Sequence, residues 1–183
     1  MIYPIRAFGD PVLRAKCEEI SENSEDLKNL IADMYETMDA SDGVGLAAPQ
    51  VGKSLRLFLV DSTHFPDEEN GVRQAFINPV ILEEEGEEWA FEEGCLSIPD
   101  IRENVTRQPE LTIKYLTEDF EEKTERFQGL TARVIQHEYD HIEGVLFTDH
   151  LTPFKKQLLK GKLSNISKGK VTVRYRMRFP KRK

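Results

Sequence analysis

Two histidines stand four residues apart late in the chain, and a glutamate directly follows the first of them. They are His137 and His141, and the glutamate is Glu138. On a helix, positions i and i+4 lie on one face about one turn apart, so both imidazoles can reach a single metal ion. Glu138 then lies beside the ion as a carboxylate that need not be a ligand. This pattern is typical of a metal ion that activates water, with the glutamate taking the proton.

The two histidines leave such a metal ion without a third protein ligand. Zinc proteases with this pattern often take it from downstream, where the candidates are Glu143, Asp149 and His150. Glu143 lies two residues past His141 and points elsewhere on a helix. Upstream, Cys95 follows a glycine in a predicted turn, and its thiolate with the two histidines would leave a fourth position for water. The residues alone leave both sources open.

Length and composition are those of a water-soluble protein. At 183 residues the chain is most simply one domain, residues 1–183, and 32% charged residues give a net charge of −8. No run approaches the roughly 18 apolar residues of a membrane span. The N-terminus has neither the apolar region of a signal peptide nor the character of a transit peptide. We therefore expect a cytoplasmic location and no membrane partner, and Cys17 and Cys95 are too few for a disulfide framework.

Charge is divided unevenly along the chain. The last 34 residues, 150–183, hold 12 lysines and arginines and no acidic residue, whereas the rest of the chain holds 13 basic and 33 acidic residues. An acidic body with a basic C-terminal extension indicates a polyanionic partner such as nucleic acid. A solvated cationic face explains the same pattern equally well.

Hydrophobic periodicity predicts an α+β fold. Helical spacing indicates an amphipathic helix over about 24–40, capped by Ser24, and a second over about 130–143 that carries the histidines and stops at Gly144. Alternating or continuous apolar runs predict strands at 55–60, 76–82, 111–116 and 123–128. We expect antiparallel sheets packed around the central metal-binding helix, with an N-terminal helix and a basic C-terminal helix and strand.

Smaller features refine this prediction. Pro79 interrupts its strand and predicts a bulge or an edge there. The segment 62–71 is polar and is expected to be a mobile loop. A basic helix is expected from Pro153 to about Lys162. The segment 171–179 alternates apolar and basic residues and predicts a half-buried strand with an arginine-lined outer face.

The glycine-rich segment 43–50, which reads GVGLAAPQ, follows the first predicted helix. Gly43 and Gly45 permit either a helix C-cap with a tight turn or a backbone that approaches a ligand closely. The segment by itself does not decide between the two.

Three segments together resemble a known family. GVGLAAPQ at 43–50, EGCLS at 93–97 and QHEYDH at 136–141 are similar, in order and separation, to the signature segments of peptide deformylase. Val44 and Pro49 are mild departures from the family pattern. The resemblance extends to about His150 and is weaker beyond it, where the predicted terminal strand suggests a subclass other than the best-known members, which end in a helix.

The resemblance implies an enzyme that removes the formyl group from the N-terminal formylmethionine of nascent polypeptides, giving formate and a free amine. It implies one divalent metal ion, Fe²⁺ in the native state of many members, with Zn²⁺, Ni²⁺ or Co²⁺ able to occupy the same ligands. It implies Glu138 as the general acid and base, and Gln50 and the backbone N–H of Leu96 as donors to the oxyanion. The implied metal ligands are Cys95, His137 and His141.

Substrate-binding residues are also implied. The family-aligned candidates for an apolar slot that takes the methionine side chain are Val44, Leu130 and Val134. Core packing would explain these three equally well. Gly45 and the strand-like stretch 98–102 could bond the substrate backbone as an added strand. We further expect Arg102 to form an ion pair with Asp140 that orients the metal ligands.

The partners implied by the resemblance are formylmethionyl nascent chains. The charge of the basic extension separately suggests docking on ribosomal RNA near the exit tunnel. Two other functions stay open at this point. One is a metallopeptidase that cuts internal peptide bonds. The other is a structural zinc site in an RNA-binding module, against which the presence of Glu138 and of the glycine-rich segment counts.

Overall fold

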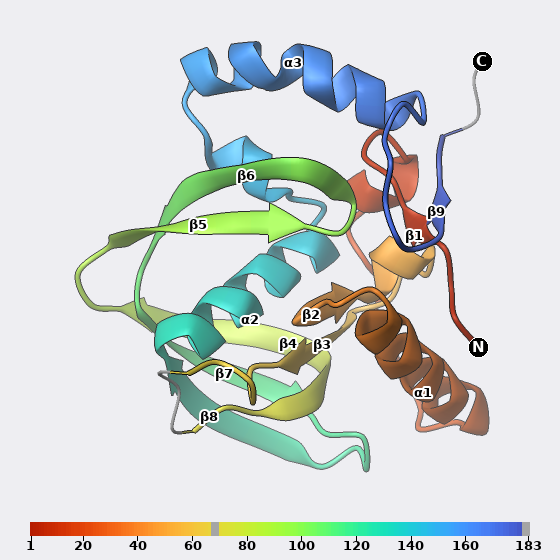
Figure 1. Cartoon of the computed structure of the whole chain (residues 1–183). Coiled ribbons are helices and arrows are strands. Elements are labelled where there is room, and N and C mark those ends of the chain that lie inside the picture. Colours follow the sequence, from red (N-terminus) through yellow and green to blue (C-terminus); the bar gives the residue numbers. More distant parts are fainter. Residues whose placement is uncertain (67–69, 181–183) are drawn as a thin grey trace.

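A five-stranded antiparallel sheet is the centre of the computed structural model, which describes residues 1–66 and 70–180 (Figure 1). Its strand order is β2-β3-β4-β7-β8. The strands are β2 (Gly45–Ala47), β3 (Leu57–Asp61), β4 (Arg73–Glu85), β7 (Glu110–Leu116) and β8 (Glu122–Gln128). Two smaller sheets accompany it: an antiparallel hairpin of β5 (Trp89–Cys95) and β6 (Ile98–Arg107), and a parallel pair of β1 (Ile5–Arg6) and β9 (Met177–Arg178).

Three α-helices complete the fold and confirm the predicted α+β class. They are α1 (Glu25–Ala40), α2 (Gly129–Ile142) and α3 (Pro153–Ser167). Short 3₁₀ helices lie at η1 (Pro11–Arg14), η2 (Ala48–Val51) and η3 (Phe147–His150). In the described part of the chain, no helix has the length and apolar character needed to cross a membrane.

The central sheet is covered on both faces. Because side chains alternate along a strand, Leu57 and Leu59 of β3 pack with the buried side of α1, whereas Phe58 and Val60 pack with α2. All five residues of β3 are therefore buried, which explains its continuous apolar run. The sheet fixes α2 as a rigid platform for the two histidines.

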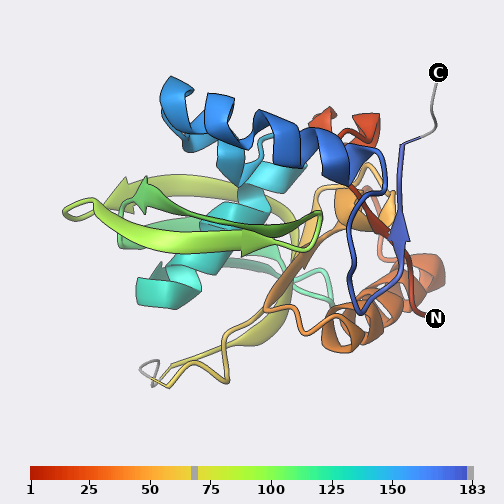
Figure 2. The same ribbon diagram turned by 45° about the horizontal axis from the view of Figure 1, so that its top comes forward.

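The β5–β6 hairpin lies on the other side of α2 from the sheet (Figure 1). Ile98, Ile101 and Val105 of β6 form a third apolar cluster with η3 and α3. Seen from the turned direction, α3 covers this end of the molecule and β9 runs beside β1 (Figure 2). Helix α2 is thus held between two sheets, as predicted from its central position.

The C-terminal prediction is correct in pattern and wrong in extent. Helix α3 continues to Ser167, five residues beyond the predicted end at Lys162. Residues 171–179 do alternate between half-buried and exposed side chains. Within this segment, however, the strand is limited to Met177–Arg178. Its strand partner in the described part of the chain, β1, is itself two residues long. Residues 67–69 of the predicted polar loop lie outside the described residues.

The predicted irregularity at Pro79 is confirmed as a bulge in β4. The preceding residue, Asn78, has a φ of 48°. Its side chain accepts a hydrogen bond from the N–H of Ile20 and donates one to the Ile20 carbonyl, both at 2.8 Å. Asparagine tolerates this left-handed conformation better than most residues, so the bulge ties the N-terminal segment to the sheet.

We predict that Asn78→Ala lowers the free energy of unfolding by about 3 kcal/mol, since two hydrogen bonds are lost and alanine is strained at positive φ. Urea unfolding of the metal-loaded protein measures the change. Asn29→Ala, at an exposed position on α1, is the matched control and should change stability little. Equal stability of the two variants would contradict the anchoring role of Asn78.

Candidate metal centre

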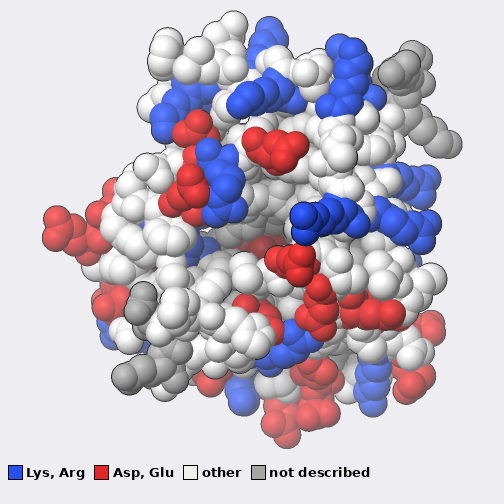
Figure 3. All heavy atoms as spheres, in the orientation of Figure 1, with Lys and Arg blue, Asp and Glu red and all other residues white. Residues whose placement is uncertain are grey.

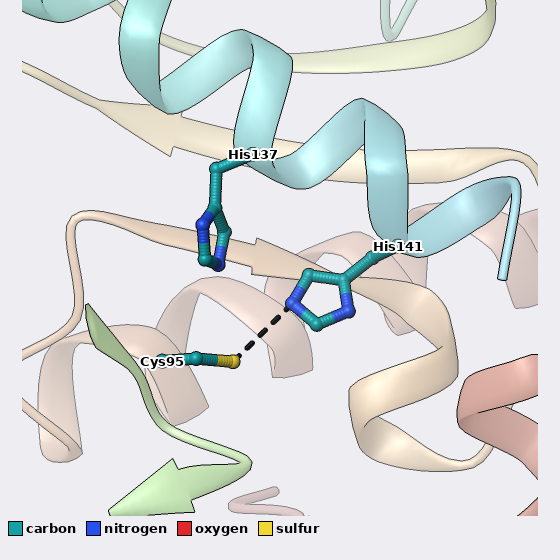
Figure 4. Close-up of side chains that lie close together, drawn as sticks. All are labelled: Cys95, His137 and His141. Atoms are coloured by element: carbon teal, nitrogen blue, oxygen red, sulfur yellow. Dashed lines mark hydrogen bonds between the residues drawn. The ribbon is translucent and has the colours of Figure 1, made fainter. Parts of the chain in front are cut away.

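Cys95, His137 and His141 converge on one point. The two imidazoles extend from the same side of α2 toward the cysteine at the end of β5 (Figure 4). Sγ of Cys95 lies 3.3 Å from Nε2 of His141, and the three potential ligand atoms all lie within 4.8 Å of one another. One thiolate and two imidazoles at this spacing match a metal site that leaves a coordination position for water.

The downstream alternatives for the third ligand are engaged elsewhere. Glu143 forms an ion pair with Arg56, and Asp149 with Arg14. Nε2 of His150 lies 2.8 Å from Oδ2 of Asp140. The tertiary structure thus selects Cys95, which the sequence left as one of two possibilities.

A buried carboxylate orients the first histidine. Oε1 of Glu93 lies 2.9 Å from Nδ1 of His137, and since a carboxylate only accepts, the imidazole donates this bond and leaves Nε2 for the metal. Burial raises the pKa of Glu93, but hydrogen bonds from His137 and Arg107 outweigh it and hold that pKa below its usual range. Glu93 therefore stays ionised as an acceptor.

Two buried arginines complete this network, and they correct one prediction. Arg107 donates from Nε to Glu93 at 2.8 Å and from Nη1 to Asp140 at 2.9 Å, while Arg133 donates to Glu93 at 2.9 Å. The partner predicted for Asp140 was Arg102. Arg102 instead pairs with Glu92 at the surface. The reason is the alternation of side chains along a strand. Residues 102 and 107 are separated by an odd number of positions, so their side chains lie on opposite faces of β6.

The pKa values of the two histidines are shifted in opposite directions. Burial lowers the pKa of His137, but hydrogen bonds to Cys95 and Glu93 raise it well above the ordinary value. Burial and the neighbouring His137 lower the pKa of His141, which keeps its ring neutral, the form that ligates a metal. A divalent cation between the sulfur and the two rings fits the geometry, and its binding requires both rings to be in the neutral form.

Glu138 lies in the same cavity, with its carboxylate against Gly45. It is only 4% exposed, and its Oε2 has no hydrogen-bond partner among the described residues. Burial raises the pKa of Glu138 to about 7. A buried carboxylate with a free oxygen and a pKa near neutrality can both accept and return a proton.

The amide of Gln50 is fixed in orientation. Its Oε1 accepts the N–H of Ala47 at 2.9 Å, so Nε2 faces Ser97 Oγ at 3.2 Å and Cys95 Sγ at 3.5 Å. The glycine-rich segment therefore does more than cap a helix, because it places the Nε2 hydrogen-bond donor of Gln50 beside the metal centre. Gln50 and Leu96 both line the cavity.

The cavity beside the metal centre has a volume of about 680 Å³. The sequence-predicted residues that line it, besides the two metal ligands Cys95 and His137, are Val44, Gly45, Gln50, Leu96, Arg102, Leu130, Val134 and Glu138. Val44 lies at the rim with 43% of its surface exposed, whereas Val134 is buried and only 9% of its surface is exposed. The fold therefore brings all of these candidates to one place from three separate segments.

Some residues of the centre were not predicted from sequence. Glu93 lies inside the EGCLS segment, two residues before Cys95, and an acidic residue so close to a candidate metal ligand is a signal that could have found it. Arg107 and Arg133 carry no comparable signal, because arginines are common and their burial is decided by the fold. Tyr175, which also lines the cavity, comes from the distant C-terminal segment.

Comparison with known proteins agrees with this geometry. The family model described as polypeptide deformylase matches residues 2–157. The chain belongs to this family. It is 58% identical to the peptide deformylase of Cytophaga hutchinsonii over the full length of both chains, and 55% identical to that of Christiangramia forsetii, covering 100% of this chain and 98% of the relative.

Solved deformylases share the fold. A peptide deformylase from Legionella pneumophila has a TM-score of 0.83 at 36% identity, with 93% of this chain and 98% of that chain covered. The enzyme from Thermotoga maritima has a TM-score of 0.76 at 45% identity, with 84% and 99% covered. The chain is thus a peptide deformylase, a metal-dependent hydrolase whose substrates are formylated nascent peptides, and not an internal-cutting peptidase or a structural zinc module.

A side chain at Gly45 would displace the buried carboxylate of Glu138. A Cβ at this position would lie 2.4 Å from Oε1 and 2.8 Å from Cγ of Glu138. We predict that Gly45→Ala lowers kcat for deformylation at least tenfold, since misplaced catalytic groups lose rate steeply, and leaves metal content unchanged.

Gly161→Ala is the control for Gly45→Ala. A Cβ there meets nothing within 4 Å on α3, so activity should be unchanged and stability slightly higher. Formate release and metal analysis of both variants measure the outcome. Wild-type kcat in Gly45→Ala would show that the close approach to Glu138 does not matter.

Proposed function

We propose that Cys95, His137 and His141 hold one Fe²⁺ ion in the native enzyme, with Zn²⁺, Ni²⁺ or Co²⁺ able to take its place in purified protein. The family resemblance supports Fe²⁺, and the donor set of one thiolate and two imidazoles suits all four ions. When bound, such an ion polarises a carbonyl and lowers the pKa of a coordinating water molecule toward neutrality. A ferrous thiolate site is oxidisable, so we expect the iron form to lose activity in air.

Glu138 is the general base and then the general acid. Its buried carboxylate accepts a proton from the attacking water and returns it to the nitrogen of the departing amine. The free oxygen, the location in the cavity and the pKa raised to about 7 by burial support this role. The products are formate and a peptide with a free amino terminus.

Gln50 and Leu96 stabilise the negative charge that develops on the formyl oxygen. The Gln50 amide is held by Ala47 with its N–H groups directed at Cys95, beside the expected position of that oxygen. The N–H of Leu96 follows Cys95 directly in the chain. One preoriented donor of this kind is typically worth about 3–4 kcal/mol of activation free energy.

The substrate lies in the cavity as an added strand. Strand β2 is the edge of the five-stranded sheet, with β3 as its sole strand partner among the described residues, so Gly45 has a free edge beside the cavity. Leu130 and Val134, one helical turn apart, line an apolar part of the cavity for the methionine side chain, and Val44 covers its rim. Arg102 at the mouth contacts the following part of the peptide.

We predict that Glu138→Gln lowers kcat by a factor of about 10³ while metal content stays the same, because the amide cannot accept the proton. The assay is formate release from a formylmethionyl peptide by anaerobically purified protein, with metal analysis of the same sample. Glu121→Gln, exposed in a turn, serves as the control. Full activity of the Glu138 variant would reject the role of this residue.

The basic extension, residues 150–183, is proposed to act as part of the same catalytic domain and to dock on ribosomal RNA in the cytoplasm. Figure 3 shows Lys and Arg side chains over α3 and beside β9, away from the acidic lower part of the molecule. The exposed members of this surface, called here the basic face, are Lys156, Lys160, Lys162, Lys168, Lys170, Arg174, Arg176 and Arg178. Their charge fits a phosphate backbone.

Replacement of Arg174, Arg176 and Arg178 by alanine should weaken co-sedimentation with ribosomes. Three lost phosphate contacts lower the slope of log affinity against log salt by about 2–3. The control with the same change in net charge replaces Lys28, Lys53 and Lys123, which are exposed elsewhere. Binding that is unchanged in the arginine variant would reject the docking proposal.

A further inference from the structure

The C-terminal segment returns to the metal centre after leaving it with α3. Residues 168–180 lie beyond the 2–157 matched by the family model. They run back alongside the N-terminus, where the N–H of Ile5 bonds the carbonyl of Arg176 at 2.9 Å and the N–H of Ala7 bonds that of Arg178 at 3.0 Å (Figure 2). The two chain ends therefore hold each other in place.

Tyr175 extends from this segment into the substrate cavity. Its hydroxyl donates a 2.8 Å hydrogen bond to the backbone carbonyl of Leu96, and its ring packs in the same apolar cluster as Leu96. Burial raises the pKa of Tyr175, so the hydroxyl stays protonated and able to donate. No other residue beyond 157 lines this cavity in the described part of the chain.

The turn that carries Leu96 is held from three directions. Gln50 donates to the side chain of Ser97 at 3.2 Å, the N–H of Phe8 donates to the Ser97 carbonyl at 2.9 Å, and Tyr175 holds the Leu96 carbonyl. The turn joins β5, which ends at Cys95, to β6, which begins at Ile98, so only two residues lie between the strands. Such a short turn has few freely rotating bonds, so each of these contacts restricts the direction of the neighbouring N–H groups.

We propose that Tyr175 is a positioning residue for deformylation: by holding the Leu96 carbonyl, it directs the Leu96 N–H at the developing oxyanion. The inference rests on the proposed role of Leu96 as a donor. The ligand bonds of Cys95 fix the chain just before Leu96, and Tyr175 fixes it just after, so the N–H between them has a defined direction. The C-terminal segment thereby completes an active site whose signature segments all lie before residue 142.

A positioning role and a packing role for Tyr175 predict different effects of a substitution on kcat and on stability. Tyr175→Phe keeps the ring against the cavity and removes only the hydroxyl. A misdirected oxyanion donor weakens transition-state binding and leaves substrate binding nearly the same, so kcat falls while KM changes little. Loss of packing alone lowers stability and leaves kcat of the folded protein intact.

The test compares Tyr175→Phe with Tyr115→Phe. Tyr115 is a buried tyrosine whose hydroxyl is bonded to Gln74 and Glu125 on the central sheet, and it does not line the cavity. We expect Tyr175→Phe to lower kcat about tenfold with KM within twofold and metal content unchanged. Tyr115→Phe should lower the melting temperature and leave kcat at the wild-type value.

Gln50→Ala and the double variant with Tyr175→Phe separate this inference from the proposed function. If both residues serve one oxyanion, the two losses in kcat are not additive, because donors acting on one atom are coupled. Wild-type kcat in Tyr175→Phe overturns the positioning role whatever Gln50→Ala does. In that case, a low kcat of Gln50→Ala still supports the proposed oxyanion site. Wild-type kcat of Gln50→Ala would reject the proposed oxyanion site as well.

Discussion

The carboxylate of Glu93 joins the β5–β6 hairpin to the central helix, and the metal centre depends on that junction. It accepts hydrogen bonds from Arg107 on the hairpin and from Arg133 and His137 on α2. All four groups are buried, so loss of the carboxylate would leave two guanidinium groups without their shared partner, at a cost of about 3–5 kcal/mol. Cys95 lies two residues further along the same strand, and the junction therefore sets the distance from its sulfur to His141.

The central sheet and the β5–β6 hairpin support the metal centre in different ways. The central sheet is covered on both faces and gives α2 a rigid base. The hairpin lies over the opposite side of α2 and closes one wall of the cavity. Burial between these layers raises the pKa of Glu138 to about 7.

The chain ends are integrated into the site, although the chemistry lies in the middle of the sequence. The N-terminal segment bonds the carbonyl of Ser97, and the C-terminal segment bonds that of Leu96. The exposed Arg174 and Arg176 flank Tyr175, so a contact made by these two arginines would act on a segment that is bonded to the turn at Leu96.

The sequence by itself determined the elements and the chemistry. Periodicity placed α1 and α2 within one or two residues, Pro79 marked the bulge, and the i, i+4 histidines with Glu138 indicated a metal that activates water, because such signals depend only on local geometry. Only the tertiary structure decided the rest. It chose Cys95 over three downstream candidates, paired Asp140 with Arg107 in place of Arg102, limited the terminal strand to two residues and brought Tyr175 to Leu96. Each of these depends on contacts between distant segments, whose register and facing side are fixed by packing and leave no periodic trace in the chain.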